Sequence, residues 1–182
     1  MRTLIFLAVS IMAVSAFGVT DSESNFIQRT GRDCTVVELW PGGTGPDDSK
    51  SNMGEQFKTK DDGWVQILSV SRPSMVIIPP KQGVRSTGVT LVLWPGGGYG
   101  SLCTGTVEQE ARWLNAMGAT AVLLKYRVPP RIDDRGKRRL PLQDAQRAIG
   151  LLRSRAGEWG LDPKKIGIGG FSAGGHLAAN AG

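Results

Sequence analysis

Residues 166–176 read IGIGGFSAGGH, and this stretch decides the fold that we expect for the chain. Its apolar first half is typical of a strand, and a helix is expected from Ser172 onward. Residues 170–174 match the pattern G-x-S-x-G at this strand–helix junction, where the serine occupies a tight and strained turn. Side chains at Gly170 and Gly174 would collide with that turn. The stretch predicts Ser172 as a nucleophile; a glycine-rich turn with an ordinary serine is the alternative.

A second glycine-rich turn lies upstream, at residues 96–98, directly after the apolar run 90–94. Acyl transfer produces an oxyanion, which N–H donors must be placed in advance to stabilise. Glycine allows such donors to approach because it has no β-carbon. We therefore predict an oxyanion hole formed by the N–H groups of Gly97, Gly98 and Ala173. The alternative is a plain glycine turn.

Strands and helices alternate around these two turns. The expected order is strand 90–94, helix 106–117, strand 119–126, helix 141–156, strand 165–171 and a helix from residue 172. This alternation predicts the α/β class, with a mostly parallel sheet and helices on both faces. Residues 64–70 and 74–79 read as hairpin-like strands that flank one edge of this sheet, and residues 47–62 read as a loop.

Composition and charge indicate one globular domain. Of the 182 residues, 40% are hydrophobic and 21% are charged, and the net charge is +6. Much of the basic excess falls within residues 125–139. A basic run can mark nucleic-acid binding, but no nucleic-acid motif accompanies it. We interpret the run as a solvated surface loop and predict no nucleic-acid partner.

The N-terminus has the layout of a secretory signal peptide. Arg2 precedes an almost wholly apolar run at residues 4–14, and small residues follow at Ser15, Ala16 and Gly18. The run is too short for a membrane span. We expect cleavage of residues 1–18, a secreted or periplasmic chain and no stable membrane span in the mature protein. An uncleaved anchor and a buried element of the fold are the alternatives.

Cysteine and histidine are scarce. Cys34 and Cys103 are the two cysteines, and an oxidising compartment would allow them to pair. The sequence leaves this pairing open. Two cysteines and one histidine are too few for a structural zinc site, so we predict no metal.

Several motifs together resemble one enzyme family. They are WPGGGY (94–99), LKYR (124–127), PLQDAQRA (141–148), WGLDP (159–163) and GGFSAGGHLA (169–178). As a set they are similar to the secreted acetylxylan esterase and feruloyl esterase branch of the α/β hydrolases, from about Val37 to Gly182. Pro95 stands where the lipase branch has histidine. The resemblance implies that an acyl-enzyme on Ser172 deacylates a polysaccharide such as xylan, without a cofactor.

The resemblance also implies groups that this sequence does not contain. Enzymes of this fold place a catalytic acid and a histidine after the nucleophile. Only ten residues follow Ser172, none is acidic, and the single histidine is His176, which we interpret as packing on the elbow helix. We expect residues 19–182 to be the N-terminal portion of an α/β-hydrolase domain, truncated after the elbow and inactive alone. A lipase-like or peptidase-like hydrolase and a non-catalytic binding remnant are the alternatives.

Overall fold

The computed structural model describes residues 34–42, 45–46, 54–61, 63–129 and 139–181. The predicted leader, residues 1–18, lies outside the described residues. So does the middle of the basic run, residues 130–138.

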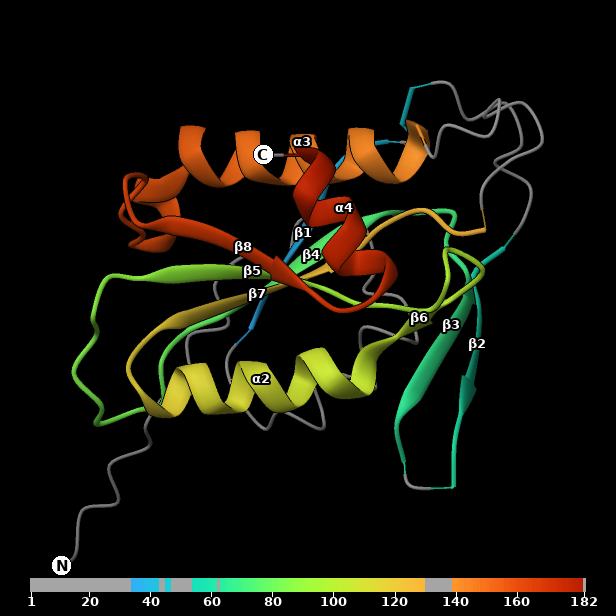
Figure 1. The fold of residues 1–182 in the computed structure, drawn as a ribbon. Coiled ribbons are helices and arrows are strands. Elements are labelled where there is room, and N and C mark those ends of the chain that lie inside the picture. The colour runs from blue at the N-terminus through green and yellow to red at the C-terminus, as the bar shows by residue number, and fades with distance from the viewer. Residues whose placement is uncertain (1–33, 43–44, 47–53, 62, 130–138, 182) are drawn as a thin grey trace, which may run out of the picture.

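A five-stranded mixed sheet forms the centre of the molecule (Figure 1). Its spatial order is β1 (Thr35–Glu38), β4 (Ser74–Ile78), β7 (Thr120–Lys125), β5 (Thr90–Trp94) and β8 (Ile166–Gly170). Strands β7, β5 and β8 run parallel, whereas β4 is antiparallel to β7 and β1 is antiparallel to β4. The predicted α/β class is confirmed, and the parallel strands are those expected from the alternating part of the sequence.

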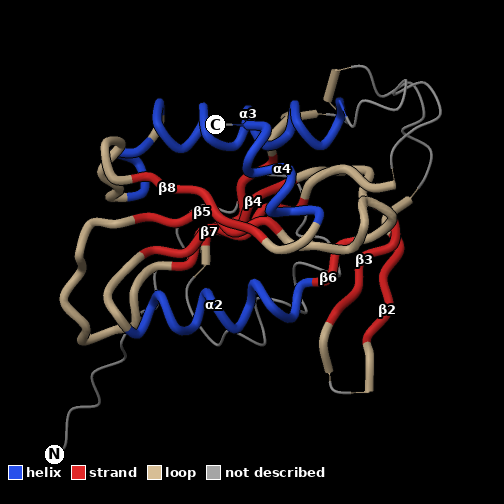
Figure 2. Tube along the Cα trace, viewed as in Figure 1, coloured by secondary structure: helices blue, strands red, loops and turns tan. Residues whose placement is uncertain are grey.

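Helices cover both faces of this sheet, as predicted (Figure 2). Helix α2 (Thr104–Ala116) lies on one face, and α3 (Arg139–Ser154) and α4 (Ala173–Ala181) lie on the other. A short 3-10 helix, η2 (Ala156–Trp159), follows α3. Because both faces are covered, all six residues of β7 are buried.

Two apolar cores fill the spaces between the sheet and the helices on its two faces. The smaller core packs Val107, Ala111 and Leu114 of α2 against one face of the sheet. The larger core fills the space beneath α3 and α4, where Trp94 and Leu177 are almost fully buried. Helices therefore pack on both faces of the parallel strands, whose carboxyl ends include the junction of β8 with α4.

A second, three-stranded antiparallel sheet corrects the expectation for residues 47–79. It contains β2 (Gln56–Thr59), β3 (Val65–Ser69) and β6 (Leu102–Cys103). The predicted hairpin is wrong because β3 pairs with β2 and β6, while β4 joins the main sheet. The predicted loop is also wrong in part, because β2 lies inside it and Phe57 packs against the larger core.

Candidate active site

Ser172 lies on a tight turn between β8 and α4. Its φ is +49°, a left-handed value that is unfavourable for a residue with a β-carbon. Two bonds close the turn: the Gly174 N–H donates to Phe171 O at 2.7 Å, and the His176 N–H donates to Ser172 O at 2.9 Å. The serine is exposed to solvent. The strained backbone expected from G-x-S-x-G is therefore present.

The two glycines of the pattern are required by contact with backbone atoms. A β-carbon on Gly174 would lie 2.0 Å from the carbonyl oxygen of Trp94. A β-carbon on Gly170 would lie 2.6 Å from the carbonyl carbon of Gly174. Neither neighbour is a side chain that could turn aside, so this close approach of β5, β8 and α4 depends on both glycines.

Replacement of Gly174 by alanine is expected to lower the free energy of unfolding of the full-length protein by about 3 kcal/mol. The added methyl group overlaps the Trp94 carbonyl and forces the turn apart. Gly150→Ala is the matched control, because the β-carbon site of Gly150 on α3 has no atom within 4 Å; it should be neutral or stabilising. Urea unfolding measures both. Equal stabilities for the two variants would contradict this packing of the turn.

The glycine loop after β5 touches the serine through its first glycine. A β-carbon on Gly96 would lie 3.2 Å from Ser172 Cβ and 2.9 Å from Phe171 O. The Cys103 N–H donates to Gly96 O at 2.9 Å, and the two residues form an isolated antiparallel bridge. Sequence reasoning named the next two glycines and missed Gly96. The run of three glycines was the available signal.

The rest of this loop is tightly curled. Gly97, Gly98 and Tyr99 have φ values of +131°, +62° and +63°. The Gly97 carbonyl accepts from the N–H groups of Gly100 and Ser101, each at 3.1 Å. The predicted donors Gly97 and Gly98 thus follow the glycine that contacts Ser172, and Ala173 is the first residue of α4. The structure brings their two segments together at the serine; their role as oxyanion donors stays a prediction.

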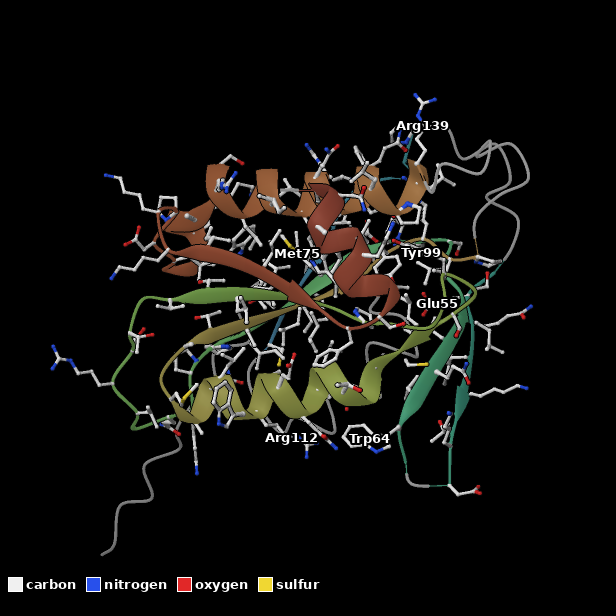
Figure 3. The ribbon with its side chains drawn as sticks, viewed as in Figure 1. Glu55, Trp64, Met75, Tyr99, Arg112 and Arg139 are labelled. Carbon is white, nitrogen blue, oxygen red and sulfur yellow. The ribbon has the colours of Figure 1, made fainter. Side chains whose placement is uncertain are left out.

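A hydrogen bond joins the glycine loop to the elbow helix. Tyr99 is buried, and its Oη lies 2.9 Å from Nδ1 of His176, with the two rings edge to face. Figure 3 shows Tyr99 beside the start of α4. The amide nitrogen of Asn180 lies 3.4 Å from the same ring. Among the described residues, these are the side-chain partners of His176, which is exposed to solvent; its interpretation as a residue that packs on the elbow helix stays a prediction.

A hydrogen bond from Tyr126 holds the start of the glycine loop. Its hydroxyl donates to the Pro95 carbonyl at 2.6 Å. Burial raises the pKa of Tyr126 far above its usual range, and the neighbouring Tyr99 and Cys103 raise it further. The hydroxyl therefore stays protonated and remains a donor at all physiological pH values.

Next to this support lies a fully buried ion pair between Arg127 and Asp144. Nη2 of Arg127 lies 2.8 Å from Oδ1 of Asp144, and the backbone N–H of Arg127 donates to Oδ2 at 2.9 Å. The Trp40 indole donates to Oδ1 at 2.8 Å. Burial raises the pKa of the Asp144 carboxyl above its ordinary value, while the hydrogen bonds and charge of Arg127 and the bond from Trp40 oppose the rise.

The first residues of the basic run are thus buried, which corrects the prediction of a solvated loop there. Arg127 is completely enclosed. Lys125 is also buried, and its Nζ lies 2.6 Å from Oε2 of Glu55. Through these ion pairs, the two cations anchor the end of β7 and the residues just after it to carboxylates elsewhere in the chain. Their charge is consequently held inside the protein.

The structure also bears on the two cysteines, on metal ligands and on membrane spans. Cys34 and Cys103 are not joined to each other by a disulfide bond. No cluster of three potential metal ligands occurs within the described ranges. None of the helices in the described part of the chain has the length and apolar character needed to cross a bilayer.

Comparison with known proteins links this geometry to carbohydrate esterases. The chain is 38% identical over 129 residues to an acetylxylan esterase of Xylanibacter ruminicola, a match that covers 70% of this chain and 25% of that protein. It is 32% identical over 90 residues to an endo-1,4-beta-xylanase B of Butyrivibrio fibrisolvens, covering 50% of this chain and 14% of the relative.

A solved structure of another carbohydrate-active hydrolase is similar to this chain. The acetyl ester-xyloside bifunctional hydrolase of Caldicellulosiruptor lactoaceticus superposes with a TM-score of 0.54 at 30% identity, covering 80% of this chain and 45% of that one. The chain thus spans less than half the length of each of these relatives. These likenesses confirm the α/β-hydrolase fold and the resemblance to carbohydrate esterases. Residues 86–182, more than half of the sequence, match the BD-FAE family model, and the chain therefore belongs to the BD-FAE family.

Proposed function

We propose that the protein is a serine ester hydrolase that removes acetyl or other acyl groups from a carbohydrate such as xylan. The observation that carries this proposal is Ser172 on its strained turn, with Gly96 packed against it. The names of the relatives support an acetylated xylan or xyloside as the substrate class.

In the proposed reaction, Oγ of Ser172 attacks the carbonyl carbon of the ester. The C–O bond to serine forms, and the carbonyl oxygen becomes an oxyanion that accepts from the N–H groups of Gly97, Gly98 and Ala173. The N-terminal end of α4 favours this negative charge. The oxyanion then collapses, and the sugar hydroxyl leaves with a proton. Water hydrolyses the acyl-enzyme, which releases the carboxylic acid and restores Ser172.

A general base must take the proton from Ser172 and return it to the sugar oxygen. His176 bonds to Tyr99 and Asn180, and Asp144 bonds to Arg127, so these groups are engaged elsewhere. We propose that a histidine and an acid outside these 182 residues complete the triad, and that residues 19–182 are the N-terminal portion of the catalytic domain. On this proposal residues 1–182 alone are inactive.

We also propose that the mature protein is secreted or periplasmic. The apolar run 4–14 after Arg2, followed by small residues, supports this. N-terminal sequencing of exported protein should begin between residues 17 and 21. An exported chain that still begins at Met1 would contradict cleavage.

Release of acetate by the full-length protein tests the proposed activity. We expect hydrolysis of acetylated xylo-oligosaccharides with a higher kcat/KM than that of acylglycerols of the same acyl group, and no cleavage of peptides. A preference for acylglycerols or peptides would indicate the lipase-like or peptidase-like alternative. Absence of hydrolysis with every ester would indicate the non-catalytic alternative.

A further inference from the structure

A hollow lies at the start of α2, beside β3 of the small sheet. Side chains of Lys60, Trp64, Gln66, Thr106 and Gln109 line it, together with Cys103 and the first turn of α2. Figure 3 shows Trp64 at this place, between the beginning of α2 and β3. The lining combines one large aromatic ring with amide and hydroxyl groups, and Lys60 is the charged residue among the described side chains that form it.

The Trp64 ring is held in place by the helix. A β-carbon on Gly105 would lie 2.9 Å from Cδ2 of Trp64 and 3.1 Å from Cε3 and Cγ. The indole therefore packs directly on the first turn of α2, at a position where any larger residue would push it away. Trp64 is only partly buried and contributes to the wall of the hollow. A ring fixed in this way loses little conformational freedom when a ligand stacks on it.

The polar side chains surround this ring. Gln66 is fixed because its Nε2 donates to Ser101 Oγ at 2.9 Å. Thr106 and Gln109 are exposed, and they lie three residues apart on one side of α2, where they are neighbours. Fixed and exposed polar groups beside an indole match a ligand with an apolar C–H face and hydroxyl groups at its edge. A pyranose ring has this chemistry. An acyl chain would form no hydrogen bonds with the amide groups of the two glutamines. A polyanion would need more positively charged side chains than Lys60 alone provides.

The hollow is linked to Ser172 through one hydrogen bond and one close backbone contact. Cys103 lines the hollow, and its N–H bonds to Gly96, the glycine that contacts the serine. Gln66 pairs with Cys103 between β3 and β6. In Figure 1 the start of α2, the small sheet and the start of α4 lie at the same end of the main sheet. A carbohydrate chain whose ester lies at Ser172 could place another sugar unit at the hollow.

We propose that this hollow is a sugar subsite in which a pyranose unit stacks on Trp64 and bonds to Gln66 and Gln109. The identity of the sugar, a xylose unit of the polysaccharide, rests on the proposed function. The subsite itself rests on the packing of Trp64 on Gly105 and on the surrounding polar groups.

Binding of unacetylated xylotetraose to the full-length protein tests the subsite without catalysis. Isothermal titration should give a Kd about tenfold higher for Trp64→Ala, in line with the loss of one central aromatic contact. Gln109→Ala, which alters an exposed side chain, should raise Kd about threefold, in line with the loss of one hydrogen bond. Trp113→Ala is the matched control: this tryptophan also lies on α2, is 63% exposed and is not part of the hollow, so Kd should not change.

Failure of the subsite and failure of the esterase proposal give different results. The subsite is overturned if the parent does not bind xylotetraose, if Trp64→Ala and Gln109→Ala bind as the parent does, or if Trp113→Ala loses as much affinity. If the parent binds xylotetraose through Trp64 but hydrolyses no ester, the subsite stands and the esterase proposal fails. In an active protein, Trp64→Ala should lower the ratio of kcat/KM for acetylated xylotetraose to that for 4-nitrophenyl acetate about tenfold; an unchanged ratio overturns the subsite.

Discussion

Replacement of Ser172 by alanine in the full-length protein is expected to lower the turnover of acetylated xylo-oligosaccharide by about 10⁶-fold. The variant lacks the oxygen that forms the acyl-enzyme in the proposed reaction, whereas the proposed backbone donors at Gly97, Gly98 and Ala173 are unchanged. A residual acceleration of about 10³- to 10⁴-fold over the uncatalysed reaction can persist. Because the site is otherwise intact, the affinity for xylotetraose should be retained. Acetate release under saturating substrate measures the loss.

Ser154→Ala is the matched control for this experiment. Ser154 is an exposed serine at the end of α3, and its hydroxyl bonds to the Leu151 carbonyl. Its removal should leave turnover unchanged. Turnover of Ser172→Ala within tenfold of the parent would contradict the assignment of the nucleophile, and a comparable loss in Ser154→Ala would show that the effect is not specific to the elbow.

Replacement of Asp144 by alanine is expected to lower the free energy of unfolding by about 3–5 kcal/mol. The variant leaves the guanidinium of Arg127 buried without its carboxylate, and the Trp40 indole loses its acceptor. Arg127 also bonds to carbonyl oxygens of Pro46 and Leu140, which cannot neutralise its charge. Urea unfolding followed by circular dichroism measures the change.

Removal of both charges of the Arg127–Asp144 pair should lower the free energy of unfolding less than removal of the Asp144 carboxylate alone. The double variant Arg127→Met, Asp144→Leu leaves no unpaired buried charge, so its stability should exceed that of Asp144→Ala. The pair Arg155–Glu158 is the control, because its side chains are 44% and 55% exposed. Glu158→Ala should change stability much less, since solvent screens that pair. Additive losses at Arg127 and Asp144 would contradict the coupling.

The elbow could be predicted from the sequence because its determinants are local. Gly170 and Gly174 flank the serine within five residues, and the structure shows each of them against a backbone atom. The parallel strands were predictable for a related reason: strands buried on both faces leave uninterrupted apolar runs such as residues 121–124. Short-range pattern and composition therefore suffice for the three parallel strands of the main sheet and for the position of Ser172.

Features that depend on distant partners could not be predicted in this way. Lys125 appeared to belong to a solvated basic run because its partner, Glu55, lies 70 residues away. Strand β3 pairs with β6, which is only two residues long and gives no periodic signal. The contact of Gly96 with Ser172 likewise joins segments that are far apart in the sequence, because β6, α2, β7, α3, η2 and β8 lie between them. Each of these depends on tertiary packing that no local pattern records.

Labelling with a fluorophosphonate tests the central claim most directly. The reagent phosphonylates a serine only where its hydroxyl is activated as a nucleophile. After labelling of the full-length protein and digestion with trypsin, mass spectrometry should place the adduct on Ser172, in the peptide that follows Lys165. Ser154 should be unlabelled, and Ser172→Ala should lose the adduct. An adduct on another residue, or ester hydrolysis by a protein whose Ser172 cannot be labelled, would contradict the account.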